Sequence, residues 1–176
     1  AMRTGKLVEA ADYSSEATIV CEKNGLTDKL ARCYYQKARV LNMQDKTDEA
    51  LTYFKKGLTK VTGINSKKEQ SMILGQIGFS FANLGKLDSA LYYQNQALKL
   101  NIELKDTLGI ANSYSNIGYV YALSNRLDQT RDYYYRASAL RKNAKDIYMR
   151  AASLIDCASL EQEMGNDTRC IGVMQQ

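Results

Sequence analysis

Apolar side chains recur at helical spacing in several segments of the chain. In residues 67–83, Leu74, Ile77 and Phe81 follow one another at steps of three and four residues, with polar or small residues between them. At about 100° per residue these side chains share one arc of a helix, whereas a half-buried strand would alternate strictly. Because the same spacing returns along the chain, the protein is predicted to be all-α.

The helical segments repeat with a period of 40 residues. LGKLDSA at 84–90 is similar to TGKLVEA at 4–10, and DKTDEA at 45–50 falls in the same register. Three columns share a residue type, two of them small or short and one aromatic: Ala10, Ala50, Ala90 and Thr130; Ala38, Gly78, Gly118 and Ala158; Tyr13, Tyr53, Tyr93 and Tyr133. Small residues let two helix backbones approach closely, while large ones fill the space between pairs. Each unit is therefore predicted to be an antiparallel helical hairpin, and the units are predicted to stack into an α-solenoid.

The register predicts about nine helices in a single array over residues 1–176. The expected helices cover residues 6–23, 28–43, 47–61, 67–83, 87–102, 108–123, 127–142 and 147–163, and a ninth begins at 167. They form a partial unit (1–25), three units (about 26–65, 66–105 and 106–145) and a second partial unit (146–176). Asn24-Gly25 and Thr62-Gly63 are expected to end helices, and Ser66 with Glu69 has the spacing of a capping box. An array that begins and ends inside a hairpin is expected to be part of a longer protein.

These columns resemble the tetratricopeptide repeat. The residues of 114–137 that carry the resemblance are Tyr114, Ile117, Gly118, Tyr121, Leu127, Thr130, Tyr133, Tyr134 and Ala137, and residues 74–98 match in the same way. The chain departs from the family pattern because it has no closing Pro, carries Lys37 and Glu161 at apolar positions, and has a longer period than the common repeat of about 34 residues. The resemblance implies a right-handed superhelix that binds peptides in its concave groove. It points to the longer subtype found in signalling adaptors and bacterial sensor or regulator proteins.

Composition argues against catalysis and against a bound cofactor or metal. The chain has no His, the commonest general base and a frequent metal ligand, and it has no Pro or Trp. Gly75 and Gly78 lie inside a predicted helix, where close packing explains them better than a phosphate loop does. Cysteines 21, 33, 157 and 170 form no CxxC motif and are expected to be small buried side chains. Cys157 and Cys170 fall on facing helices of one hairpin, so a regulatory disulfide between them is the alternative.

The groove-facing arc of each first helix lies opposite its packing arc. Twelve residues are predicted to line a peptide-binding groove: Arg32, Tyr35, Gln36, Arg39, Met72, Gln76, Phe79, Asn83, Asn112, Asn116, Tyr119 and Asp156. The same arc is expected to carry Asn42 and Ala82. Amides offer a donor and an acceptor together, and in-register aromatic residues supply apolar anchors for a peptide. The alternative is that the amides are simply solvated and that Phe79 packs against the neighbouring helix.

Charge is distributed unevenly although the net charge is only +5. Arg32 and Arg39 lie at one end of the predicted groove, and Asp156 and Glu163 lie at the other. This gradient could orient an extended peptide with its acidic portion towards the arginines, or the cations could serve only solubility. Basic residues such as those at 55, 56 and 60 are interleaved with acids on convex faces, which argues against nucleic-acid binding.

The sequence thus favours a peptide- or protein-binding scaffold without catalysis. The alternative is a ligand-sensing or regulatory segment of a larger sensor kinase or transcription regulator, and a third reading is self-association through the hairpins cut at each end. The longest apolar runs are too short to span a bilayer, and the first residues lack the apolar core of a signal peptide, so no membrane contact is expected in this segment. The cysteines without an evident partner favour the cytoplasm, while a periplasmic location stays open for a membrane-bound sensor.

Overall fold

The computed structural model describes residues 2–63, 66–142 and 147–165, and these ranges hold eight helices and no strand. The helices are α1 (Met2–Lys23), α2 (Thr27–Met43), α3 (Thr47–Gly63), α4 (Lys67–Asn83), α5 (Leu87–Glu103), α6 (Thr107–Leu123), α7 (Leu127–Arg141) and α8 (Ile147–Glu163). The all-α prediction is confirmed, and from α2 to α8 each helix begins and ends within two residues of its expected bounds. The expected ninth helix lies outside the described residues.

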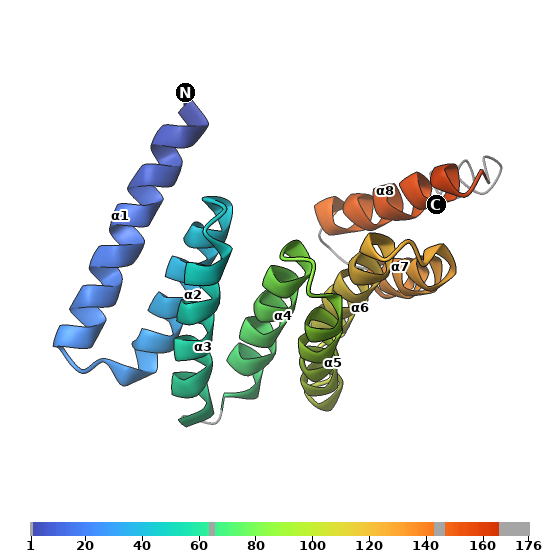
Figure 1. Ribbon diagram of the computed structural model, residues 1–176. Coiled ribbons are helices and arrows are strands. Elements are labelled where there is room, and N and C mark those ends of the chain that lie inside the picture. Colours follow the sequence, from blue (N-terminus) through green and yellow to red (C-terminus); the bar gives the residue numbers. More distant parts are fainter. Residues whose placement is uncertain (1, 64–65, 143–146, 166–176) are drawn as a thin grey trace.

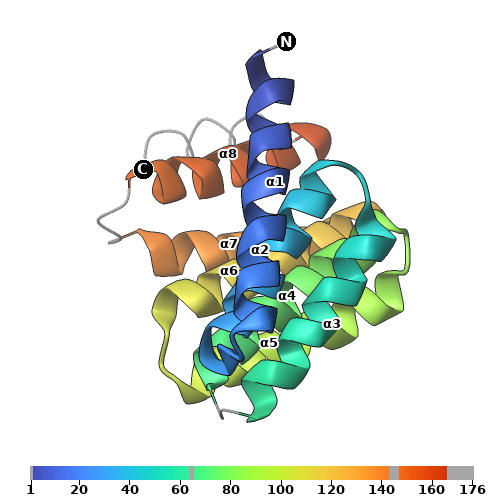
Figure 2. The same cartoon turned by 90° about the vertical axis from the view of Figure 1, so that its left-hand side faces the viewer.

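The helices form a twisted stack of antiparallel pairs. Each helix packs mainly on its neighbours in the sequence, and α4 also contacts α6. Figure 1 shows the pairs side by side in chain order, and the helix axes turn progressively between α1 at one end and α8 at the other. The view in Figure 2 shows the same rotation, with α8 lying across the direction of α1. This arrangement is the solenoid that the 40-residue register predicts.

Turn residues with a positive φ angle separate the helices at multiples of 20 residues. Gly25 and Gly85 have φ values of 64° and 69°, while Asp45, Lys105 and Asn125 have values of 61°, 53° and 55°. The turn after α5 has the hydrogen bonds of a Schellman motif, because Asp106 N donates to Asn101 O at 3.0 Å and Lys105 N donates to Ile102 O at 3.0 Å. The left-handed conformation is favourable for Gly and costly for a residue with a Cβ.

Lys105→Gly is therefore expected to raise the free energy of unfolding by about 0.5–1 kcal/mol. Lys105 is exposed, so the substitution removes backbone strain without removing a buried contact. Lys99→Gly is the matched control, because Lys99 is an exposed residue inside α5. It should lower the same free energy by about 1 kcal/mol. Chemical denaturation measures both, and a loss of stability in the Lys105 variant would contradict the account of the turn.

The capping-box prediction at Ser66 was wrong. Ser66 is the N-cap residue of α4, but its side chain makes no capping hydrogen bond. Asp106, the N-cap residue of α6 one period later, has nearly the same backbone angles and accepts a hydrogen bond from Gly109 N at 2.9 Å. The backbones match, so the two N-caps differ only in whether the side chain bonds the helix amide: the Asp106 carboxylate does, and the Ser66 hydroxyl does not.

The predicted columns fill the interior of the hairpins. Ala38, Ala50, Ala90, Thr130 and Ala158 are buried. Phe81 stacks on Tyr93 with ring centroids 5.4 Å apart, and Tyr121 stacks on Tyr133 at 5.5 Å. Tyr13 differs from the rest of its column, because it is 71% exposed on α1. Tyr93 of α5 is covered by α4, the first helix of the same hairpin. Among the described residues no helix precedes α1, so Tyr13 has no such cover.

Candidate functional site

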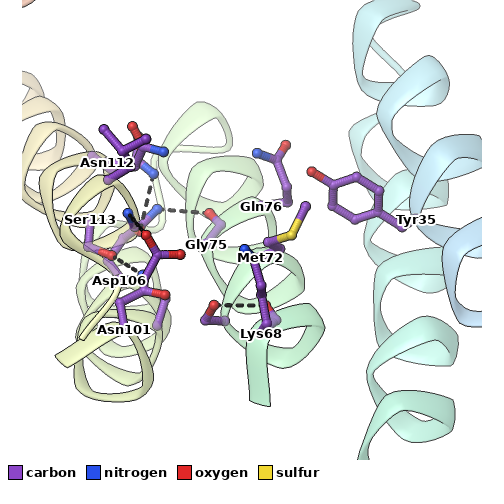
Figure 3. A pocket seen from close by; sticks show the side chains of 15 residues that line it. Tyr35, Lys68, Met72, Gly75, Gln76, Asn101, Asp106, Asn112 and Ser113 are labelled. Atoms are coloured by element: carbon purple, nitrogen blue, oxygen red, sulfur yellow. Dashed lines mark hydrogen bonds between the residues drawn. The ribbon is translucent and has the colours of Figure 1, made fainter. Parts of the chain in front are cut away.

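A pocket of about 360 Å³ lies between α4 and α6, over α5. Its lining comes from four helices and the turn before α6: Tyr35, Lys68, Ser71, Met72, Gly75, Gln76, Gln94, Ala97, Asn101, Asp106, Leu108, Gly109, Asn112, Ser113 and Asn116. Figure 3 shows the Tyr35 hydroxyl directed towards Gln76, with Asn112 and Ser113 on the opposite side. One cation and one anion, Lys68 and Asp106, stand among many uncharged polar groups, so the pocket offers donors and acceptors without a strong net charge.

Hydrogen bonds between helices fix the polar floor of the pocket. Gln94 is fully buried on α5 and donates through Nε2 to Gly75 O on α4 at 2.8 Å. Its Oε1 accepts from Asn116 Nδ2 on α6 at 3.3 Å. Asn101 Nδ2, also on α5, donates to Ser113 Oγ at 3.0 Å. Since buried polar groups that are paired hold their geometry, the floor is formed before any ligand arrives.

Two aromatic rings from α4 and α6 stack one helical turn away from the pocket. Phe79 and Tyr119 lie with ring centroids 5.8 Å apart and an interplanar angle of 28°. Both side chains are half-buried, so each covers part of the other and leaves part open to solvent. The alternative expectation for Phe79, packing against the neighbouring helix, is thus met in part. Tyr35 on α2 packs edge-on against Phe54 at 5.9 Å.

Five of the twelve predicted groove residues line this pocket. They are Tyr35, Met72, Gln76, Asn112 and Asn116. Three others lie outside the pocket on exposed parts of α2, where Arg39 Nη1 donates to Gln36 Oε1 at 3.4 Å and Arg32 is exposed nearby. The guanidinium of Arg39 also lies over the Tyr35 ring, 5.8 Å from its centroid. Asn83 is exposed at the end of α4, outside the pocket lining.

Two residues expected on the groove face pack inside the stack instead. Asn42 Nδ2 donates to Ser80 Oγ on α4 at 2.8 Å, and Ala82 is 2% exposed against Ala90 and Val120. Each lies four residues after a member of the small column, Ala38 or Gly78. Residues four apart share a helix face, so these positions belong to the packing side and the groove face is narrower than predicted.

Arg141 bonds the predicted groove residue Asn112, although the groove prediction did not include it. It is 6% exposed on α7, and its guanidinium donates through Nη1 to Ser115 Oγ at 2.9 Å and through Nη2 to Asn112 Oδ1 at 2.6 Å. Burial lowers the pKa of Arg141, although an arginine stays cationic in proteins. Burial raises the pKa of the Asp156 carboxyl on α8, and the charge of Arg141 opposes that shift. The cation of Arg141 therefore lies near Asp156, at the predicted acidic end of the groove. The side chain of Glu163, the other acidic residue predicted at this end, lies outside the described residues.

The sequence held a signal for the missed residues. Gln94 lies in the register of Phe54, and Asn101 and Arg141 lie in the register of Val61. Phe54 and Val61 are buried core residues, so a polar residue at the same position of another unit marks a buried polar group. Such a group needs a partner, which here comes from the adjacent first helix.

The described part of the chain contains neither a cluster of metal ligands nor a membrane-spanning helix. No group of three or more Cys, Asp or Glu side chains there is placed to hold a metal ion. None of the described helices is long and apolar enough to cross a bilayer.

Solved structures share this fold at low sequence identity. BtubC (BKLC) from P. vanneervenii matches with a TM-score of 0.81 and 19% identity, covering 99% of this chain and 72% of that one. A Rap protein complexed with competence and sporulation factor matches with a TM-score of 0.87 and 16% identity, covering 98% of this chain and 48% of that one. A signal transduction ATPase with numerous domains and a tetratricopeptide repeat sensor, from Pyrococcus horikoshii, matches at 0.77 and 16%, covering 90% of this chain and 25% of that one.

A search of curated proteins gave no match. Two family models, both described as tetratricopeptide repeat, match residues 31–59 and residues 69–143, which together make up more than half of the chain. The chain belongs to the tetratricopeptide repeat family.

Proposed function

We propose that this chain is a protein-interaction scaffold without catalytic activity of its own, and that it binds an extended peptide along the face shared by α2, α4 and α6. Membership of the tetratricopeptide repeat family supports the scaffold role. The observation that carries the proposal is the amide-lined pocket beside the Phe79–Tyr119 stack. Gln76 and Phe79 are three residues apart, as are Asn116 and Tyr119, so each helix presents an amide and a ring on one face.

The polar groups of the pocket suit a peptide backbone. A backbone carries one donor and one acceptor per residue, and the side-chain amides of Gln76 and Asn116 offer both kinds of group. A volume of about 360 Å³ has room for one large side chain but not for a folded domain. The exposed edges of Phe79 and Tyr119 would contact the next apolar residue of the peptide.

Charge sets the proposed direction of the peptide. Arg32 and Arg39 are exposed on α2 at one side of the pocket, and Arg39 is partly held over the Tyr35 ring. An acidic portion of the peptide would lie next to them, because complementary charge orients a ligand even where it adds little affinity. The buried Arg141 is already bonded to Asn112 and Ser115, so it would contribute mainly by positioning these side chains.

A regulatory segment of a larger signalling protein is the second candidate function. One structural neighbour is an ATPase that carries a tetratricopeptide repeat sensor, and another is a Rap protein solved with competence and sporulation factor. With this second function, the same pocket would bind a signalling peptide, and the output would come from a domain attached to the array. The two candidates therefore share the site and differ in what binding controls.

Selection from a random-peptide phage library tests the proposal. Panning against the folded chain should enrich peptides that carry an aromatic or large apolar residue, and the Asn112→Ala, Asn116→Ala double variant should bind them more weakly. Lys55→Ala on the exposed face of α3 is the matched control and should bind them as the wild type does. Failure to enrich any peptide over a blank surface, or equal binding by the double variant and the wild type, would contradict the proposal.

A further inference from the structure

The repeat brings the same two positions close together at several junctions between units. At the junction of α5 and α6, Asn101 and Ser113 are hydrogen-bonded at 3.0 Å and both are buried. One period earlier the equivalent residues, Val61 of α3 and Ile73 of α4, belong to one core cluster. In each pair the two residues are twelve apart in the sequence. The first lies in the last turns of a second helix, and the other lies in the second turn of the next first helix.

At the junction of α1 and α2 these two positions are Cys21 and Cys33. Their Sγ atoms lie 3.0 Å apart, and both are free thiols. A disulfide has an S–S bond of about 2.05 Å, so the two sulfurs need to approach by about 1 Å. The proximity follows from the stacking of the units, since a second junction places Asn101 and Ser113 in contact at the same positions and a third places Val61 and Ile73 in one core cluster.

We propose that Cys21 and Cys33 form a modification site that a two-electron oxidant of the peroxide class closes into a disulfide, fastening α1 to α2. Cys33 is half-buried and Cys21 is 6% exposed, so peroxide reaches Cys33 first. The Cys33 thiol and hydrogen peroxide give a sulfenic acid and one water. The Cys21 thiol then attacks the sulfenic sulfur, the S–S bond forms and a second water leaves. The two sulfurs are oxidised, and the peroxide oxygens are reduced.

The surroundings of the two thiols make their oxidation slow, unlike that of a catalytic cysteine. Burial, together with the hydrogen bond and charge of Cys21, raises the pKa of Cys33 to about 11. The thiolate is the reactive form, so a protonated Cys33 reacts only under sustained oxidant. Cys157 is a free thiol with 1% exposure, which shields it from the same reagent.

The disulfide would act on α1, one of two helices that pack mainly on a single neighbour in the described part of the chain. In the described part of the chain α1 packs mainly on α2, whereas α4 contacts α3, α5 and α6. Tyr13 of α1 is exposed, although the other three tyrosines of its column are half-buried. A covalent link between α1 and α2 restricts the unfolded chain and keeps α1 docked.

Treatment of the folded chain with hydrogen peroxide, followed by intact-mass measurement and peptide mapping without reductant, tests the proposal. The wild type and Cys157→Ser should each lose two hydrogen atoms and yield a peptide linked through Cys21 and Cys33, and their melting temperature should rise on oxidation. Cys33→Ser should show neither change. Oxidation that leaves both thiols free, or that yields only links between molecules, would overturn the proposal.

An engineered pair at an equivalent junction separates the geometry from the reactivity of the native thiols. In a Cys21→Ser, Cys33→Ser background, Asn101→Cys with Ser113→Cys should crosslink under the same oxidant, because these positions are already in contact. Asn95→Cys with Ser113→Cys is the mismatched control, since Asn95 is an exposed residue of α5 that bonds its own helix. Equal crosslinking by both pairs would show that the repeat junction does not determine disulfide formation and would overturn the geometric argument.

Discussion

Gly118→Ala is expected to lower the free energy of unfolding by up to about 2 kcal/mol, because overpacking a helix contact costs about 1–3 kcal/mol and alanine regains about 1 kcal/mol of helix propensity. A Cβ at this position would lie 2.6 Å from Tyr134 Cδ1 and 2.7 Å from Cε1. The Tyr134 ring has little room to move away, since it packs against Cys157 and Ala158 of α8. The substitution therefore forces α6 and α7 apart within their hairpin.

Gly75→Ala is the matched control for this prediction. A Cβ at Gly75 would have only Gln94 Oε1 within reach, at 3.9 Å, which is ordinary contact. Alanine should therefore raise the free energy of unfolding by about 0.5–1 kcal/mol through helix propensity. Urea denaturation followed by circular dichroism measures both variants. A shift in the same direction for both would mean that the small column is not the place where the helices make their closest approach.

The helices and turns could be predicted from the sequence because the same pattern of residues occurs in several repeat units. A column such as Ala38, Gly78, Gly118 and Ala158 marks where helices approach, and one ambiguous unit is corrected by the others. The turns carry a second signal at multiples of 20 residues, with Gly25 and Gly85 in the left-handed conformation. Capping was predicted less well, since Ser66 and Asp106 have nearly the same backbone angles and only the Asp106 side chain bonds a helix amide.

The candidate site was predictable only on the helices that were assigned to the groove. Angular spacing along one helix predicted that Gln76 and Asn116 lie on the groove-facing arc, and both line the pocket. It could not predict the contacts of Gln94 and Arg141, because both lie on second helices and their contacts depend on how the helices pack together. The Cys21–Cys33 contact was missed for a related reason: it arises where one unit stacks on the next.

The Phe79→Ala, Tyr119→Ala double variant is expected to weaken binding of a peptide selected against the chain by at least about 100-fold, which corresponds to about 2.7 kcal/mol. The two rings stack across α4 and α6 and would present their open edges to the peptide. Each ring is half-buried, and Tyr119 also packs against Ala82 and Val120, so circular dichroism is needed to show that helicity persists in the variant. Tyr92→Ala is the control, since Tyr92 is an aromatic side chain of α5 with 63% exposure that lies outside the pocket lining.

The dissociation constant of one selected peptide, measured by isothermal titration calorimetry for these three proteins, tests most directly whether the face of α2, α4 and α6 is the binding surface. Wild type and Tyr92→Ala should bind alike, and the Phe79→Ala, Tyr119→Ala variant, with an unchanged circular dichroism spectrum, should lose at least about 100-fold in affinity. Equal affinity of the double variant and the wild type would contradict the account.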